Sequence, residues 1–197
     1  GGVIFAQSEG PENPTALQAS DCTFANSEAY NFGGAIAMGT GIPLGSYTSL
    51  TVSSSAFYNN STENSQNGFG GAIAVFGNWS PSSESIESVS ISSSDFSGNV
   101  AELRGGAFFG QGLNSLTIAT TRFTENHTKG LSGTHNRWGG GVFIDQADAV
   151  VLGNSLLGGN TAIQGVADSA IGGGFYGQNL NTFELYNSVF VENTATQ

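Results

Sequence analysis

The sequence predicts an all-β chain that folds as a right-handed parallel β-helix of about six coils, one coil for each repeat. Three observations predict this fold. Two short motifs alternate along the whole chain, and the spacing of apolar residues inside one of them never changes. Gly, Ser, Thr and Asn are abundant while helix-forming residues are few, which is typical of turn-rich β structure.

The first motif is a glycine pair that opens a short apolar run. Such a pair suits a strand entry where the backbone adopts positive φ or where two chain segments approach closely. The motif marks the starts of the repeats within a single domain over residues 1–197. Its copies are GGVI at 1, GGAI at 33, GGAI at 70, GGAF at 105, GGVF at 140 and GGFY at 173.

The second motif is a twelve-residue block that ends in Phe-x-x-Asn. Copies begin at residues 49, 88, 115 and 182, with weaker copies at 16 and 149. Each begins with alternating apolar residues, which predict a half-buried strand followed by a bend. Parallel stacking of the blocks, about 4.8 Å apart, would place their large apolar residues on one another in the core. These residues are Phe24, Phe57, Phe96, Phe123, Leu157 and Phe190.

Two further columns belong to the same block. Asn tolerates left-handed geometry and can hydrogen-bond to its stacked neighbour, so the last residue of the block is expected in a turn with an Asn ladder. The ladder residues are Asn60, Asn99, Asn126, Asn160 and Asn193, with Ser27 in the first copy. Two residues before each large apolar residue, only small side chains occur: Cys22, Ser55, Ser94, Thr121, Ser155 and Ser188. Cys22 is the only cysteine, so it is expected to be a small buried filler, and no intrachain disulfide can form.

Composition narrows the classes of function. The formal net charge is −11 and the chain has four basic residues, which opposes binding to nucleic acid and docking on anionic membranes. No apolar run reaches the ~18 residues needed to cross a bilayer, so direct membrane insertion of this segment is not expected. The chain has no signal peptide and opens in mid-pattern, which suggests a mature or trimmed segment of a longer solenoid, or a stacking subunit.

The alternating GGA[ILV] and FxxN motifs resemble those of the chlamydial polymorphic membrane proteins. GGAI at 33 and 70 and FxxN at 57, 96, 123 and 190 match as they stand, and the resemblance covers the whole chain. It implies the β-helical passenger of an autotransporter adhesin, which would be secreted or anchored at the outer membrane.

The outward-facing columns offer no cluster of carboxylates of the kind that β-helix enzymes use for acid–base chemistry or metal binding. We therefore predict no catalytic residues, no metal site and no cofactor. Asp95 and Arg122 are expected to be rung neighbours that form a surface ion pair. A polysaccharide-acting lyase or hydrolase is a distant alternative, and it would depend on Asp145, Asp148 or Asp168.

The segment 127–138 is the most unusual loop, because it contains both histidines, two of the four basic residues and a tryptophan. It could grip an acidic or sugar ligand, with the tryptophan as a stacking platform. The alternative is a solvated insertion whose tryptophan packs against the neighbouring rung. The candidate ligand residues are His127, Lys129, His135, Arg137 and Trp138.

Four asparagines lie in N-x-S/T sequons. Asn59 and Asn78 are the candidates for glycosylation if the protein follows a eukaryotic secretory route. Asn60 and Asn126 are instead expected inside the ladder.

The glycine-pair strands carry apolar residues at consecutive positions, so both of their faces are apolar. One face is expected to line the core. The other is either covered by the loop that follows or exposed as a lateral sticky stripe. Neither end of the repeat carries a capping helix, which leaves strand edges that invite stacking.

These patterns lead to three functional hypotheses. The first is an extracellular, cell-surface adhesive scaffold whose side loops contact a host receptor or a glycan. The second is an end-to-end stacking subunit of an extracellular filament, whose partners are copies of itself. The polysaccharide-acting enzyme is the third.

Overall fold

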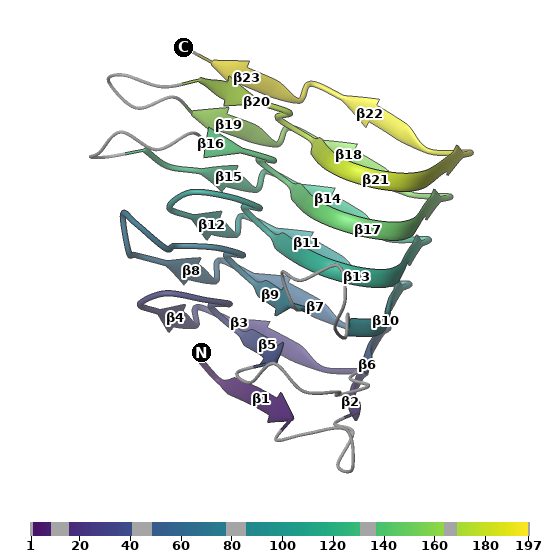
Figure 1. Cartoon of the computed structure of the whole chain (residues 1–197). Coiled ribbons are helices and arrows are strands. Elements are labelled where there is room, and N and C mark those ends of the chain that lie inside the picture. The colour runs from purple at the N-terminus through teal and green to yellow at the C-terminus, as the bar shows by residue number, and fades with distance from the viewer. Residues whose placement is uncertain are drawn as a thin grey trace.

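The computed structural model describes residues 2–8, 16–40, 49–77, 86–130, 137–163 and 169–196. Within these ranges the regular structure is all β, and the strands climb from the N-terminal to the C-terminal end as a right-handed parallel β-helix (Figure 1). The described part of the chain contains no helix long and apolar enough to span a membrane.

One sheet of nine strands is built from both motifs. In the first three repeats the glycine-pair strand and the block strand are separate, whereas in the last three a single strand of 12 residues runs through both. The glycine-pair strands are β1 (Ile4–Ser8), β5 (Ile36–Thr40) and β9 (Ile73–Phe76). The block strands are β2 (Ala16–Ser20), β6 (Ser49–Ser53) and β10 (Ile86–Ser92). The long strands are β13 (Phe108–Ala119), β17 (Val142–Gly153) and β21 (Phe175–Tyr186).

Two further sheets of six strands complete each rung. The second sheet contains β3 (Thr23–Ala25), β7 (Ala56–Tyr58), β11 (Asp95–Ser97), β14 (Arg122–Thr124), β18 (Leu156–Gly158) and β22 (Val189–Val191). The third contains β4 (Glu28–Ala29), β8 (Ser61–Thr62), β12 (Val100–Ala101), β15 (His127–Thr128), β19 (Thr161–Ile163) and β23 (Thr194–Thr196). A small sheet pairs β16 (Arg137–Trp138) with β20 (Ala170–Ile171). The chain passes each six-stranded sheet six times, so about five turns separate the first pass from the last, and the predicted β-helix is confirmed.

The large apolar residues of the block form one buried column. Their strands pair in the predicted register, with Phe57 opposite both Phe24 and Phe96. Adjacent rings along Phe24, Phe57, Phe96 and Phe123 have centroids 4.8, 4.6 and 4.7 Å apart and lie nearly parallel. Leu157 continues this column in the core. The fixed spacing within each block therefore sets which side chains meet across the rungs.

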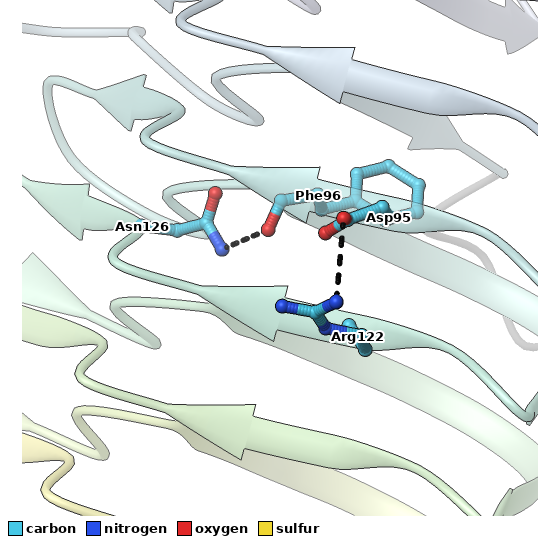
Figure 2. Close-up of polar contacts among 4 residues, drawn as sticks. All are labelled: Asp95, Phe96, Arg122 and Asn126. Carbon is cyan, nitrogen blue, oxygen red and sulfur yellow. Dashed lines mark hydrogen bonds and ion pairs between the residues drawn. The ribbon is translucent and has the colours of Figure 1, made fainter.

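The asparagine ladder runs beside this column and is fully buried in its central rungs. Asn99 shows its hydrogen bonding: Nδ2 donates to the carbonyl oxygen of Phe57 and to Oδ1 of Asn126, both at 2.9 Å. Its Oδ1 accepts from the backbone N–H of Asn60 at 3.0 Å and from Asn60 Nδ2 at 2.9 Å. Figure 2 shows the equivalent bond from Asn126 to the carbonyl oxygen of Phe96. Each central amide is thus satisfied inside the protein, by the rungs on either side of it.

The expected left-handed geometry of the ladder asparagine is wrong by one position. Positive φ occurs at the residue before it: Asn26 (54°), Asn59 (53°), Gly98 (64°), Glu125 (57°), Gly159 (62°) and Glu192 (55°). A left-handed residue at this corner turns the chain from the second sheet into the third, and in the central rungs the side chain that follows it is buried. The amide can therefore reach its neighbours only because the preceding residue makes the turn.

The small column also forms a ladder, made of hydroxyl groups. Ser55 Oγ donates to the carbonyl oxygen of Ser53 at 2.7 Å and accepts from the backbone N–H of Cys22 at 3.2 Å. Ser94 Oγ accepts from the backbone N–H of Ser55 in the same way. Cys22 occupies its predicted place in this column but is only half-buried, because it lies on the first rung.

The glycine-pair motif has a strict geometric cause. Gly70 has a φ of +65°, and a Cβ on Gly71 would overlap the carbonyl oxygen of Gly106 on the next rung. The register places the last two copies one residue earlier than the sequence indicated. Gly139 and Gly172 carry the positive φ of the first glycine, so a third glycine takes the place of Ala35, Ala72 and Ala107 in three of the other copies.

The number of residues in a rung varies although the lattice does not. Successive ladder residues are 33, 39, 27, 34 and 33 positions apart. The differences fall at two connections, one after the glycine-pair strand and one after the third sheet. Insertions at these two edges therefore leave the core unchanged.

Truncation of a stacked ring tests the inward column. Phe96→Ala or Phe123→Ala should lower the free energy of unfolding by about 3–5 kcal/mol, because each removes a fully buried ring from between its neighbours. Denaturant unfolding measures the change. Tyr58→Ala is the control, since Tyr58 adjoins a stacked Phe in β7 but is only half-buried. An unchanged stability in both Phe variants would refute the inward stack.

Removal of one ladder amide tests the second column. Asn99→Ala should destabilise the fold by roughly 3 kcal/mol, because it leaves buried donors and acceptors on both neighbouring rungs without partners. Asn59→Gly is the matched control, since Asn59 is exposed at a corner where Gly98 and Gly159 occur on other rungs. Equal losses in the two variants would contradict the ladder's role.

Candidate functional site

The described ligand residues of segment 127–138 lie in different environments. His127 lies in β15 and Lys129 follows that strand, and both are half-buried. Arg137 is fully buried, so its guanidinium is not presented at the surface. His135 lies outside the described residues. A ligand role for this loop therefore stays a prediction.

Trp138 instead belongs to a column that runs directly before the glycine pairs. Single parallel bridges connect Phe32 to Phe69, Phe69 to Arg104 and Arg104 to Trp138. The alternative interpretation of this tryptophan, that it packs against the neighbouring rung, is confirmed.

The outer face of the glycine-pair strands forms a second apolar cluster with this column. We call it the aromatic seam, and its residues are Phe32, Phe69, Phe76, Phe109, Trp138, Phe143 and Tyr176. Ring centroids along the seam are 4.7 Å apart for Phe32–Phe76, 4.8 Å for Phe69–Phe109, 5.2 Å for Phe109–Phe143 and 5.5 Å for Phe143–Tyr176. Phe109 and Phe143 are buried while the other members are half-buried. Rings that precede the glycine pairs thus cover the outer face, a solution that neither sequence-based alternative included.

Arg104 interrupts the seam with a positive charge. Its Cζ lies 4.7 Å from the centroid of the Trp138 ring system, 5.5 Å from that of Phe69 and 5.4 Å from that of Phe143. Burial lowers the pKa of Arg104, and the nearby Asp145 and Tyr176 oppose this shift electrostatically. A guanidinium titrates so high that it keeps its charge at physiological pH.

Two polar donors of the seam lack partners. Arg104 Nε and Trp138 Nε1 are both buried, and neither donates a hydrogen bond. Across the described ranges Arg104 makes neither an ion pair nor a side-chain hydrogen bond. Its charge faces three aromatic rings at distances typical of cation–π contacts, and Asp145 acts on it electrostatically.

Polar side chains on the long strands adjoin the seam. Asp145 is buried in β17, where its carboxylate accepts from Gln111 Nε2 at 3.1 Å and from Asn179 Nδ2 at 3.0 Å. Tyr176 donates its hydroxyl to Gln178 Oε1 at 3.1 Å. Amide groups on neighbouring rungs thus hold this buried carboxylate in place.

Two of the three acids named for the enzyme alternative, Asp145 and Asp148, lie on β17 in different environments. Asp148, on the same strand as Asp145, is exposed and accepts from Asn181 Nδ2 at 2.8 Å. Asp168 lies outside the described residues. Within the ranges that the structure describes, no three His, Cys, Asp or Glu side chains are grouped so that they could hold a metal ion.

The remaining surface predictions are placed as follows. Arg122 Nη1 and Asp95 Oδ2 lie 4.0 Å apart on adjacent rungs, as expected (Figure 2). Asn59 is exposed, so its sequon is accessible in the folded protein, whereas Asn60 and Asn126 are buried in the ladder. Asn78 lies outside the described residues.

Column residues at the two outer rungs are exposed. Phe190 pairs with Leu157 in the predicted register, but its side chain is 44% exposed because no described rung lies beyond it. Phe183 and Leu185 in β21 are exposed in the same way, as are Val3 and Phe5 at the other end.

Comparison with known proteins does not assign the chain to a family. No protein-family model matches the chain, and no curated protein or solved structure is significantly similar to it.

Arg104 is the residue that sequence reasoning overlooked. It directly precedes the glycine pair at 105, where other repeats carry Phe32 or Phe69. If the later motif is taken to begin at Gly140 rather than Gly139, Trp138 does not align with this column. With the motif in its true register, a lone cation among rings becomes visible in the sequence.

A ring at position 104 should suit the lattice better than the cation does. Arg104→Phe is expected to leave the free energy of unfolding unchanged or to raise it by up to about 2 kcal/mol, because a half-buried charge that makes no ion pair is replaced by an apolar ring. Thermal and denaturant unfolding measure the effect. A loss of more than about 1 kcal/mol would instead make Arg104 a structural requirement.

Proposed function

We propose that this chain is an extracellular, cell-surface adhesive scaffold whose side loops contact a host receptor or a glycan. The resemblance of its GGA[ILV] and FxxN motifs to those of the chlamydial polymorphic membrane proteins supports this proposal. This resemblance supports the proposal that the chain belongs to the passenger of a secreted or outer-membrane-anchored autotransporter.

The observation that carries the proposal is the stacking of insertion points along one edge. Segments 9–15, 41–48 and 78–85 each connect a glycine-pair strand to a block strand. Ser8 and Thr40, the residues directly before the first two segments, pair with each other. Ala16 and Ser49 directly follow these two segments and also pair, and Ser49 pairs in addition with Ser88, shortly after the third segment. Three insertions therefore start and finish at neighbouring positions on consecutive rungs. A fold whose core is constant while the insertions along one edge differ is suited to presenting a binding surface made of several insertions.

The sequence of these insertions differs from that of the lattice. All four prolines of the chain lie within them: Pro11, Pro14, Pro43 and Pro81. They also contain Tyr47 and Trp79, aromatic residues of the kind enriched at protein and glycan interfaces. The strands exclude proline because their residues must offer an N–H to the ladder, so proline is confined to these insertions.

End-to-end stacking into a filament is the second candidate. In this arrangement one more parallel rung on β21–β23 would bury Phe183, Leu185 and Phe190. A second copy of the chain would supply that rung in a filament.

Deletion of one insertion tests the adhesive role without disturbing the core. In β13 only Gly112 separates Gln111 from Leu113, and Gly77 and Ile86 occupy the positions equivalent to Gly112 and Leu113. Deleting 78–85 joins Gly77 to Ile86 and so reproduces a corner that the chain already uses. The variant should keep its circular dichroism spectrum and melting temperature but lose binding to cultured epithelial cells and to a glycan array, measured with chain-coated beads.

A second variant separates loop chemistry from loop length. Replacing 78–85 by a Gly/Ser linker of equal length should also abolish binding. Full binding by both variants, or no binding by the unmodified chain to any cell or glycan, would reject the proposal.

A further inference from the structure

Arg104 occupies a position where the lattice favours an apolar ring. Its neighbours in the column are Phe69 below and Trp138 above, and both approach the guanidinium with their ring faces. Burial penalises the charge here, and Nε has no acceptor. If stability alone decided the residue here, an apolar ring would be expected. The presence of a cation therefore indicates that this position binds a ligand.

The other basic residues emphasise this difference. Arg122 faces Asp95 at 4.0 Å, and Arg137 is fully buried. The chain has only four basic residues against a net charge of −11, so a half-exposed arginine without an ion pair is not part of a general basic surface. Its charge is available to one local partner.

The ring contacts do not use the N–H groups of the guanidinium. Arg104 Cζ lies over the rings of Phe69 and Trp138, and Nε donates no hydrogen bond. An in-plane fork of N–H groups matches the two oxygens of a carboxylate. The ring edges around it carry partial positive charge, which also favours an anionic group at this surface.

Neighbouring polar groups limit the size and charge of the ligand. Asp145 lies close enough to act electrostatically on Arg104, so a polyanion would be repelled. Gln178, Asn179 and the Tyr176 hydroxyl are half-buried or exposed, and they supply neutral donors and acceptors close to that carboxylate. Such groups bind hydroxyls, and a hydroxyl-rich ligand with a single carboxylate fits both requirements.

We propose that Arg104 anchors a binding site on the aromatic seam for a singly charged acidic sugar, of the sialic acid or uronic acid class. The guanidinium binds the sugar carboxylate edge-on, and the amides around Asp145 bind its hydroxyls. This inference rests on the proposed adhesive function and names the ligand class for one part of that surface.

Tryptophan fluorescence gives a direct test. In a Trp79→Phe background Trp138 is the only tryptophan, and its ring contacts Arg104. Titration with N-acetylneuraminic acid and glucuronic acid should give a saturable change in emission, confirmed by calorimetry, whereas galactose and glucose should give none. Arg104→Phe keeps the ring column intact and should weaken binding by about tenfold or more, because the charged partner of the carboxylate is lost.

The matched control is Arg122→Gln, which removes an exposed arginine from another sheet and should leave the affinity unchanged. Three results would overturn the site: no saturable response to either acid, equal affinity in the Arg104→Phe variant, or equal affinity for neutral sugars. Binding of acetate as tightly as the acidic sugars would also overturn it, since the hydroxyl contacts would then contribute nothing.

The cell-binding assay separates this site from the proposed function. Adhesion that is lost on deletion of 78–85 but kept in Arg104→Phe, together with no response to acidic sugars, rejects the seam site and leaves the adhesive role intact. Saturable, Arg104-dependent sugar binding by a chain that adheres to no cell supports the site and rejects the adhesive role.

Discussion

The buried asparagine ladder is the constraint on which the rest of the structure depends. Each central amide has partners only on the rungs above and below, and no water can replace them in the core. A shift of one strand by a single residue would leave several of these groups buried and unpaired, at a cost of a few kcal/mol per group. The ladder therefore fixes the register, and the stacked Phe rings follow because they lie a constant distance before each asparagine in sequence.

Fixed register at the core allows freedom at the edges. Rungs of 27 and 39 residues stack beside rungs of 33, because extra residues leave the lattice at a corner and return to the same place. The outer face follows the same vertical stacking, and Phe32, Phe69 and Trp138, which precede glycine pairs, pack in the cluster on this face. We expect a chain built in this way to tolerate changes in its insertions, or in one column residue such as Arg104, without a change of fold. That independence is what a scaffold for variable binding surfaces requires.

Much of the lattice could be predicted because its columns are local in sequence. The interval from Leu50 to Phe57 and Asn60 repeats on other rungs, so parallel stacking alone identifies their neighbours. The candidate ligand loop could not be assessed in this way. Arg137 and Trp138 are adjacent in sequence, yet one is fully buried and the other is half-exposed in the seam, since successive strand residues point to opposite sides.

The sequence by itself determined the parallel β-helix, the six copies of the block and the identity of the inward columns, because periodic spacing translates directly into vertical contact. Only the tertiary structure decided that the left-handed residue precedes the ladder asparagine, that the later glycine motifs begin at Gly139 and Gly172, and that Arg104 lies between Phe69 and Trp138. These features depend on backbone angles and on contacts between rungs more than 30 residues apart. Spacing within one repeat carries no information about either.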